Sequence, residues 1–320
     1  MKNSSHFQNR MALFLGLFFS VAFAQAAPPP TTKPPVWMMP PQLQELFDHP
    51  DQWAQTRSKI TGIGCADHGL GKISDADLRA WATALKAWNL KFCLEVGAVK
   101  PWGQTGAAAF NGEHRFWDKF INAGGTLDTI AMDEPLCCTR SLHKPDDYAV
   151  EETAQFIKLA RAQYPNLHIG DIEAYPSLSY EDLTAWIDAL QAKLQSMNVK
   201  GIEFFRLDVN WVHFVINDKI GHGGWPEVKK LELFCRSRHI PFSLIYWAAD
   251  LPALRNRGIA DDSTWYISTL QQGNDYALVD GAPDEIALIS WVRAPSHTVP
   301  ETDPWTFTRS VLDFCNMFVK

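Results

Sequence analysis

Acidic residues close several apolar runs of this chain. The clearest run is LDTIAMDEP, which ends in Asp133, Glu134 and Pro135, while the run FFRLD ends in Asp208. Two carboxyl groups held close together can divide acid and base work, since one protonates a leaving oxygen while the other attacks carbon or activates water. Paired acids of this kind are typical of sites that cleave glycosidic bonds.

Further acids stand at the ends of other apolar runs. They are Glu95, Asp171, Glu173 and, just beyond its run, Asp250. Asp171 and Glu173 are two residues apart, so on a strand their side chains share one face. Each of these acids also has a structural explanation, either as the partner of a basic residue or as the cap of the following helix.

Aromatic residues follow the same runs. The chain has 13 tryptophans, and the flat faces of Trp and Tyr stack on the C–H faces of sugar rings. Burial in the core is the alternative explanation for any one of them. The residues that we select as candidate substrate contacts are Tyr175, Trp211, Tyr246, Trp247, Trp291, Asp171 and Asp250.

The apolar runs alternate with amphipathic stretches typical of helices, which predicts a parallel sheet. Eight such runs in order predict fold class α/β with a single (β/α)8 TIM barrel. The expected strands are residues 36–39, 60–66, 90–96, 127–132, 167–174, 201–209, 242–247 and 286–292. The closing helix is expected at residues 304–318, with Asp303 as its cap. An open doubly wound sheet is the alternative, although no Gly-rich phosphate-binding motif follows the first strands.

These elements would bring the candidate residues to one place. In a (β/α)8 barrel the chemistry lies at the rim formed by the C-terminal ends of the strands. Asp133, Glu134 and Asp208 are expected on that rim. Asp171 and Glu173 are expected to point into the barrel interior or its mouth.

The sequence Asp133-Glu134-Pro135 resembles the Asn-Glu-Pro motif that closes the fourth strand in a large clan of barrel glycoside hydrolases. The Glu of that motif is the acid/base, so the resemblance implies that Glu134 is the general acid. The clan has its nucleophilic Glu at the end of the seventh strand, where this chain reads PFSLIYWAAD and has no Glu. Asp208 or Glu173 is therefore the expected nucleophile or base, and Asp133 is a further catalytic candidate.

The sequence thus predicts a glycoside hydrolase that acts on a poly- or oligosaccharide without a cofactor or a metal. A barrel that binds carbohydrate without cleaving it is one alternative, which the missing Glu of the seventh strand favours. A metal-dependent barrel hydrolase is a weaker alternative, because it needs clustered histidines at strand ends. The histidines of this chain are scattered singly.

The charge of the chain bears on its partners. The formal net charge is -7 and the isoelectric point is about 5.8. No cluster of Lys and Arg provides a phosphate-binding surface, which argues against nucleic acid. A neutral sugar is the expected substrate and a monomer the expected state.

The first residues are typical of a secretory signal. Lys2 and Arg10 precede the apolar stretch MALFLGLFFSVAFA, and small residues place cleavage near Ala24 or Ala26. Residues 1–26 are therefore predicted to be a signal peptide, 27–41 a proline-rich lead-in and 36–320 the barrel. The mature protein is expected to be secreted or periplasmic, away from the membrane.

Six cysteines in an exported chain permit up to three disulfides. Buried thiols are the alternative for Cys65 and Cys93, which lie on neighbouring expected strands.

Overall fold

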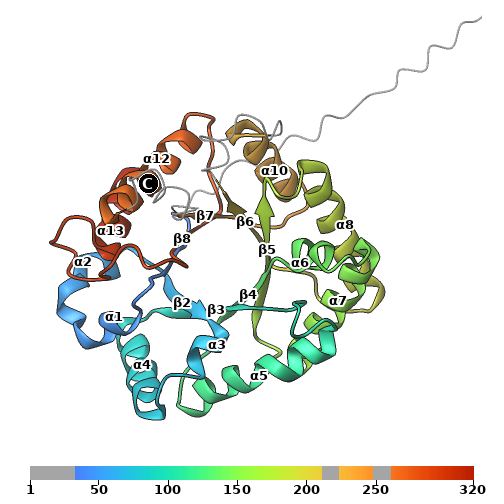
Figure 1. Cartoon of the computed structure of the whole chain (residues 1–320), viewed down its shortest axis with the longest axis horizontal. Coiled ribbons are helices and arrows are strands. Elements are labelled where there is room, and N and C mark those ends of the chain that lie inside the picture. The colour runs from blue at the N-terminus through green and yellow to red at the C-terminus, as the bar shows by residue number, and fades with distance from the viewer. Residues whose placement is uncertain (1–32, 211–222, 248–260) are drawn as a thin grey trace, which may run out of the picture.

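The strands of this chain close into a barrel. A computed structural model describes residues 33–210, 223–247 and 261–320, and its eight strands pair in parallel and in chain order, with β8 beside β1 (Figure 1). The strands are β1 (Val36–Met39), β2 (Gly62–Ala66), β3 (Lys91–Val96), β4 (Thr129–Asp133), β5 (His168–Tyr175), β6 (Phe204–Val209), β7 (Phe242–Tyr246) and β8 (Glu285–Ile289). The predicted (β/α)8 barrel is confirmed, and every strand end lies within three residues of its expected position.

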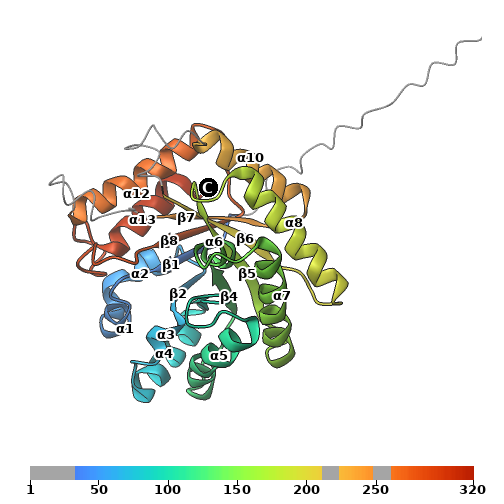
Figure 2. The ribbon, with the colours of Figure 1, turned by 45° about the vertical axis from the view of Figure 1, so that its right-hand side comes forward.

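Helices cover the outside of this barrel (Figures 1 and 2). The longer ones are α4 (Asp75–Trp88), α5 (Gly106–Asn122), α7 (Asp146–Gln163), α8 (Tyr180–Ser196), α10 (Trp225–Ser237), α12 (Asp262–Ala277) and α13 (Phe307–Phe318). The shorter ones are α1 (Gln44–Asp48), η1 (Pro50–Trp53), α2 (Ala54–Arg57), α3 (Asp67–Leu70) and α6 (Pro135–Ser141).

Side-chain caps fix where several helices begin. The hydroxyl of Ser74 accepts a hydrogen bond from the backbone of Asp77 at the start of α4, and Ser179 forms a capping box with Asp182 at the start of α8. The predicted start of the closing helix is wrong. Thr306, not Asp303, caps that helix, which therefore begins three residues later than expected.

The barrel interior is packed with side chains, and two strand glycines make room for large rings. A Cβ atom on Gly62 would lie 2.4 Å from the ring of Trp37, and one on Gly170 would lie 2.2 Å from the ring of Phe204. The absence of these side chains lets both rings occupy the interior. The interior cluster comprises Trp37, Met39, Cys93, Ala131, Ile172, Phe204, Ile245, Ala287 and Ile289.

All six cysteines are free thiols, so none of the permitted disulfides is present. The strand register explains this for the β2–β3 pair. Cys93 pairs with Gly64 and points into the barrel, whereas the neighbouring Cys65 packs on the helix side. In the described part of the chain, no helix has the length and apolar character to cross a membrane. The predicted signal segment, residues 1–26, lies outside the described residues.

Candidate active site at the barrel mouth

Four acids meet at the C-terminal ends of the strands. Glu95 lies near the end of β3, Asp133 is the last residue of β4, Glu134 follows it, and Asp208 lies near the end of β6. Alternation along each strand explains the inward direction, because Glu95 is two residues beyond the interior residue Cys93. The same spacing separates Asp133 from Ala131, and twice that spacing separates Asp208 from Phe204.

Two tryptophans hold two of these acids. The indole Nε1 of Trp247 donates to Oδ1 of Asp208 at 2.6 Å. The indole Nε1 of Trp291 donates to Oε1 and Oε2 of Glu95 at 3.0 and 3.3 Å. The two rings are perpendicular, with centroids 4.9 Å apart, and Trp291 is 40% exposed. Two of the predicted aromatic contacts, Trp247 and Trp291, therefore lie at the mouth, next to acids.

A buried lysine neutralises part of the acidic charge. Lys100, in the loop after β3, places Nζ 2.5 Å from Oδ2 of Asp133 and 3.1 Å from Sγ of Cys138. Burial alone lowers the pKa of Lys100, but Asp133 and Cys138 outweigh burial and raise it, so the side chain is held as a cation.

Glu134 occupies an unusual backbone conformation. Its φ of 52° and ψ of 49° lie in the left-handed region, directly before Pro135 at the start of α6. For a residue other than glycine this conformation costs about 1–2 kcal/mol. Residues in strained backbone conformations cluster at functional sites. The backbone N–H of Glu134 donates to the carbonyl of Ile172 at 2.9 Å, which anchors this turn to β5.

The surroundings favour the protonated form of three of these acids. Burial raises the pKa of Glu95 to about 8, and the charge of Asp133 adds to the effect. Burial and Asp133 also raise the pKa of Glu134, whereas Lys100 opposes the rise. Burial raises the pKa of Asp208 well above its ordinary value, followed by the charge of Glu134. A carboxyl group that keeps its proton at a higher pH is what general acid catalysis needs.

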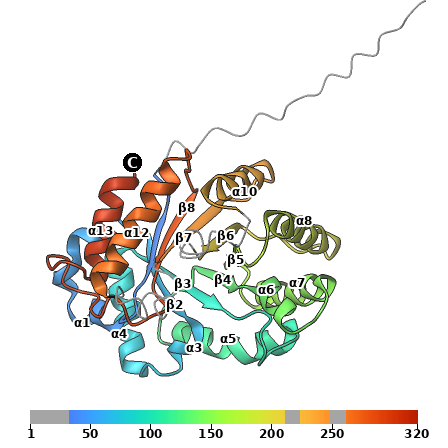
Figure 3. The same ribbon diagram turned by 45° about the horizontal axis from the view of Figure 1, so that its top comes forward.

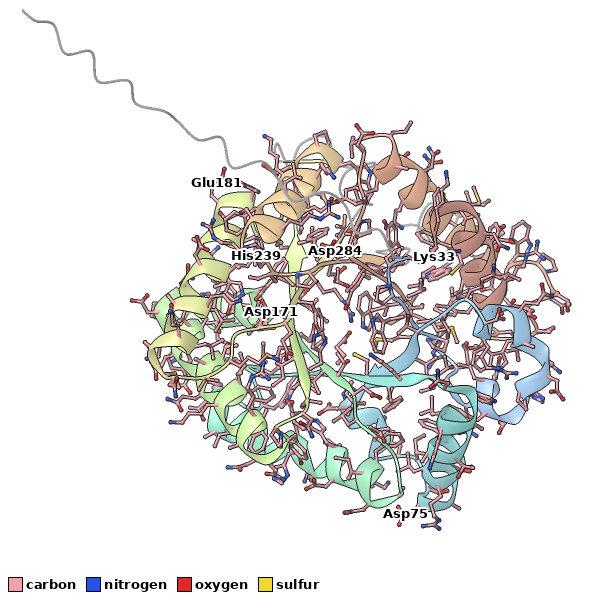
Figure 4. All side chains as sticks on the ribbon, turned by 180° about the vertical axis from the view of Figure 1, so that it is seen from behind. Lys33, Asp75, Asp171, Glu181, His239 and Asp284 are labelled. Carbon is pink, nitrogen blue, oxygen red and sulfur yellow. The ribbon has the colours of Figure 1, made fainter. Side chains whose placement is uncertain are left out.

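Two candidate acids lie away from the mouth. The prediction that Asp171 and Glu173 point into the barrel is wrong, because both face the surrounding helices (Figure 4 labels Asp171). Asp171 accepts from Nε1 of Trp186 in α8 at 2.7 Å. Glu173 accepts from the backbone N–H groups of Leu136 and Cys137 in α6 at 2.6 and 3.2 Å. Glu173 thus stabilises the first turn of α6, which is a structural role.

The two candidate tyrosines also lie in the packing layer between strands and helices. Tyr175 is 2% exposed and donates its hydroxyl hydrogen to Glu227. Tyr246 is 3% exposed, and its ring centroid lies 4.6 Å from that of Phe314. Neither ring lines the mouth. The remaining candidates, Trp211 and Asp250, fall outside the described residues.

Two residues of the site, Glu95 and Lys100, have little or no signal in the sequence. Glu95 had a strand-end position as its signal, but its contact with Trp291 depends on the closed barrel. Lys100 had no local signal, because its approach to Asp133 depends on the path of the loop after β3. Within the described ranges, no three His, Cys, Asp or Glu side chains are arranged to hold a metal ion.

Comparisons with known proteins agree on the fold alone. No protein-family model matches the chain. No curated protein matches it. Among solved structures, D-psicose 3-epimerase in the presence of D-fructose is 11% identical, with a TM-score of 0.50 over 89% of this chain and 99% of that one. The Ignisphaera aggregans GH53 catalytic domain is 10% identical, with a TM-score of 0.46 over 76% of each chain. An aldolase, QR15, is 14% identical, with a TM-score of 0.43 over 79% of this chain and 88% of that one. The epimerase, at a TM-score of 0.50, agrees with the closed barrel seen in this chain, and at 11% identity it shows the fold alone.

Proposed function

We propose that this protein is a glycoside hydrolase that cleaves a neutral oligo- or polysaccharide at the mouth of its barrel. The observation that carries the proposal is the meeting of Glu95, Asp133, Glu134 and Asp208 with two tryptophans at the C-terminal ends of the strands. Two neighbouring carboxyl groups can supply acid and base. Aromatic faces hold the sugar ring.

Glu134 is the proposed general acid. Its carboxyl O–H transfers a proton to the glycosidic oxygen while the bond from that oxygen to the anomeric carbon breaks. The burial and the neighbouring Asp133 that raise its pKa keep this proton on the carboxyl group. The left-handed backbone at Glu134 turns the chain out of β4, which sets the direction of the side chain.

Asp208 is the proposed nucleophile or base. The Trp247 indole holds Oδ1, and we assign Oδ2 to attack on the anomeric carbon or to activation of water. The charge of Glu134 is among the causes that raise the pKa of Asp208. A proton on Glu134 removes that charge and so favours the ionised form of Asp208, which gives the pair one acid and one base.

The other mouth residues support this pair. The Asp133 carboxylate provides negative charge beside a developing oxocarbenium ion, and Lys100 fixes its position. Glu95 holds the indole of Trp291, and the rings of Trp247 and Trp291 are the proposed stacking surfaces.

The test is release of reducing ends from neutral and charged polysaccharides. Wild-type protein is compared with Glu134→Gln, Asp208→Asn and the matched control Glu181→Gln, an exposed acid at the start of α8. We expect activity on a neutral polysaccharide in the wild type and the control, and a loss of at least about 100-fold in Glu134→Gln. Full activity in Glu134→Gln contradicts the assignment of the acid.

Carbohydrate binding without hydrolysis is the second candidate function. It is favoured by the hydrogen bonds that commit Glu95 and Asp208 to positioning tryptophans. Retention of a polysaccharide by wild-type protein, with no reducing ends released, supports this second candidate over the first.

A further inference from the structure

We propose that a cavity beside the mouth is a subsite for an additional sugar unit of a neutral chain, on the side of the mouth formed by β2, β3 and β4. The inference rests on the proposed function and extends it to the size and charge of the substrate. The cavity has a volume of about 540 Å³, within the roughly 300–1,000 Å³ typical of ligand pockets.

The cavity is continuous with the proposed active site. Glu95 and Asp133 line it, and both also belong to the acid cluster at the strand ends. Its outer wall is formed by α3 and α5, which lie side by side on this flank of the barrel (Figures 1 and 3). A ligand bound at the acids therefore extends into this cavity without a break.

The wall of the cavity suits a sugar ring. Trp102 lies at its edge with 76% of its surface exposed, and the ring of Phe116 lines the wall. The α5 side is made of small residues, including Ala109 and Gly112. An exposed indole over a wall of small residues provides a flat apolar surface and the space for a ring to lie against it.

Polar groups in the cavity match sugar hydroxyls. Asp67 is buried and accepts from Nε1 of Trp117 at 3.3 Å. Glu113 is buried and accepts from the backbone N–H of Gly97 at 3.0 Å. Burial raises the pKa of Asp67 to about 6 and that of Glu113 to about 8. A protonated carboxyl group donates to and accepts from sugar hydroxyls, whereas an ionised one accepts only. Above a pH of about 6 the ionised Asp67 repels a carboxylate. Lys100 and Arg115 also line the cavity, but Lys100 is paired with Asp133 and Arg115 is exposed to solvent. This charge distribution favours a neutral sugar over a uronic acid.

The structure offers a way to fill the cavity. A Cβ atom on Gly112 would meet no atom within 4 Å, so Gly112→Leu places a side chain in the cavity without a backbone clash. A Cβ atom on Gly69 is equally unobstructed, and Gly69 does not line the cavity. Gly69→Leu is therefore the matched control. Trp102→Ala removes the stacking surface at the edge.

The experiment uses cello-, manno- and malto-oligosaccharides from disaccharide to hexasaccharide, with oligogalacturonides as the anionic comparison. Hydrolysis kinetics and calorimetric binding are measured for the wild type and each variant. We expect Gly112→Leu and Trp102→Ala to raise KM and Kd for the longer oligosaccharides on the order of tenfold. Values for the disaccharide, and all values for Gly69→Leu, are expected to match the wild type.

The outcomes separate this inference from the proposed function. Wild-type hydrolysis with unchanged KM, Kd and product lengths in both variants overturns the subsite and leaves the proposed function in place. Absence of hydrolysis with a length-dependent loss of binding in both variants supports the subsite and removes the proposed function. Absence of binding to every neutral oligosaccharide, or equal binding of oligogalacturonides, overturns the inference.

Discussion

The indole of Trp291 donates to both carboxyl oxygens of Glu95, and this contact links the segment after β8 to β3 across the mouth of the barrel. The two residues are 196 positions apart in the chain. The contact fixes one wall of the proposed site and partly offsets the effect of burial, since a donor to the carboxylate lowers the pKa of Glu95.

Trp291→Phe tests this link, because it keeps a ring and removes the N–H donor. Loss of the donor disfavours the ionised carboxylate, so the pKa of Glu95 is expected to rise from about 8 by roughly half to one unit. A carbon-13 NMR titration of the Glu95 carboxyl measures the shift. Trp305→Phe, at an exposed tryptophan that packs on Tyr266, is the control and should leave the titration unchanged.

Glu134→Gly is expected to stabilise the fold relative to Glu134→Ala while both variants lose hydrolysis. Glycine adopts a φ of 52° without the steric cost that alanine retains, and the expected gain is about 1 kcal/mol in the free energy of unfolding. Urea denaturation measures the difference. Ala84→Gly, within α4, should instead lose stability by a similar amount. Equal stability of the two Glu134 variants would show that the turn carries no strain.

Glu173→Ala should destabilise the protein by about 2–3 kcal/mol, because the substitution leaves the N–H groups of Leu136 and Cys137 without their carboxylate acceptor. Glu173→Gln keeps an acceptor oxygen and should cost less. Chemical denaturation and kcat are measured together. A Glu173→Gln protein that folds with wild-type stability but lacks turnover would contradict the structural role and restore Glu173 as a catalytic candidate.

Glu113 should make stability fall as the pH rises. Burial, with the charge of Asp67, raises its pKa in the folded state from 4.5 to about 8. The folded protein therefore holds this proton more tightly than the unfolded chain, and the stability it contributes is full below pH 4.5 and lost as the pH approaches 8. Glu113→Gln should flatten the decline of Tm between these pH values. Glu181→Gln, at an exposed position, should leave the decline unchanged.

The order of the strands could be predicted from the sequence because each strand is a short apolar run between two amphipathic stretches. Which side chains of a strand face the barrel interior and which face the helices could not be predicted. In β5 both faces are buried, one by the barrel interior and one by helices, so no polar–apolar alternation distinguishes Ile172, which points inward, from its acidic neighbours Asp171 and Glu173. Because Asp171 and Glu173 share the face of β5 that packs against the helices, neither lies in the predicted site.

The acids that end strands could be found from the sequence, since they interrupt apolar runs. The contacts that hold these acids in place could not be predicted from the sequence, because they join segments that are distant along the chain. Lys100 reaches Asp133 through the loop after β3, and Trp247 reaches Asp208 from the neighbouring strand. Both contacts depend on closure of the barrel, which a local pattern does not report.

The rings of Trp37 and Phe204, admitted by Gly62 and Gly170, close the barrel below the acids. Within the described residues, the proposed site is consequently closed on the side of the barrel interior. A polymer cannot thread through it and must lie across the rim, entering and leaving on the same side. For the proposed polysaccharide substrate, both chain ends would remain in solvent, so the length of the polymer would set no limit on access to the cleaved bond.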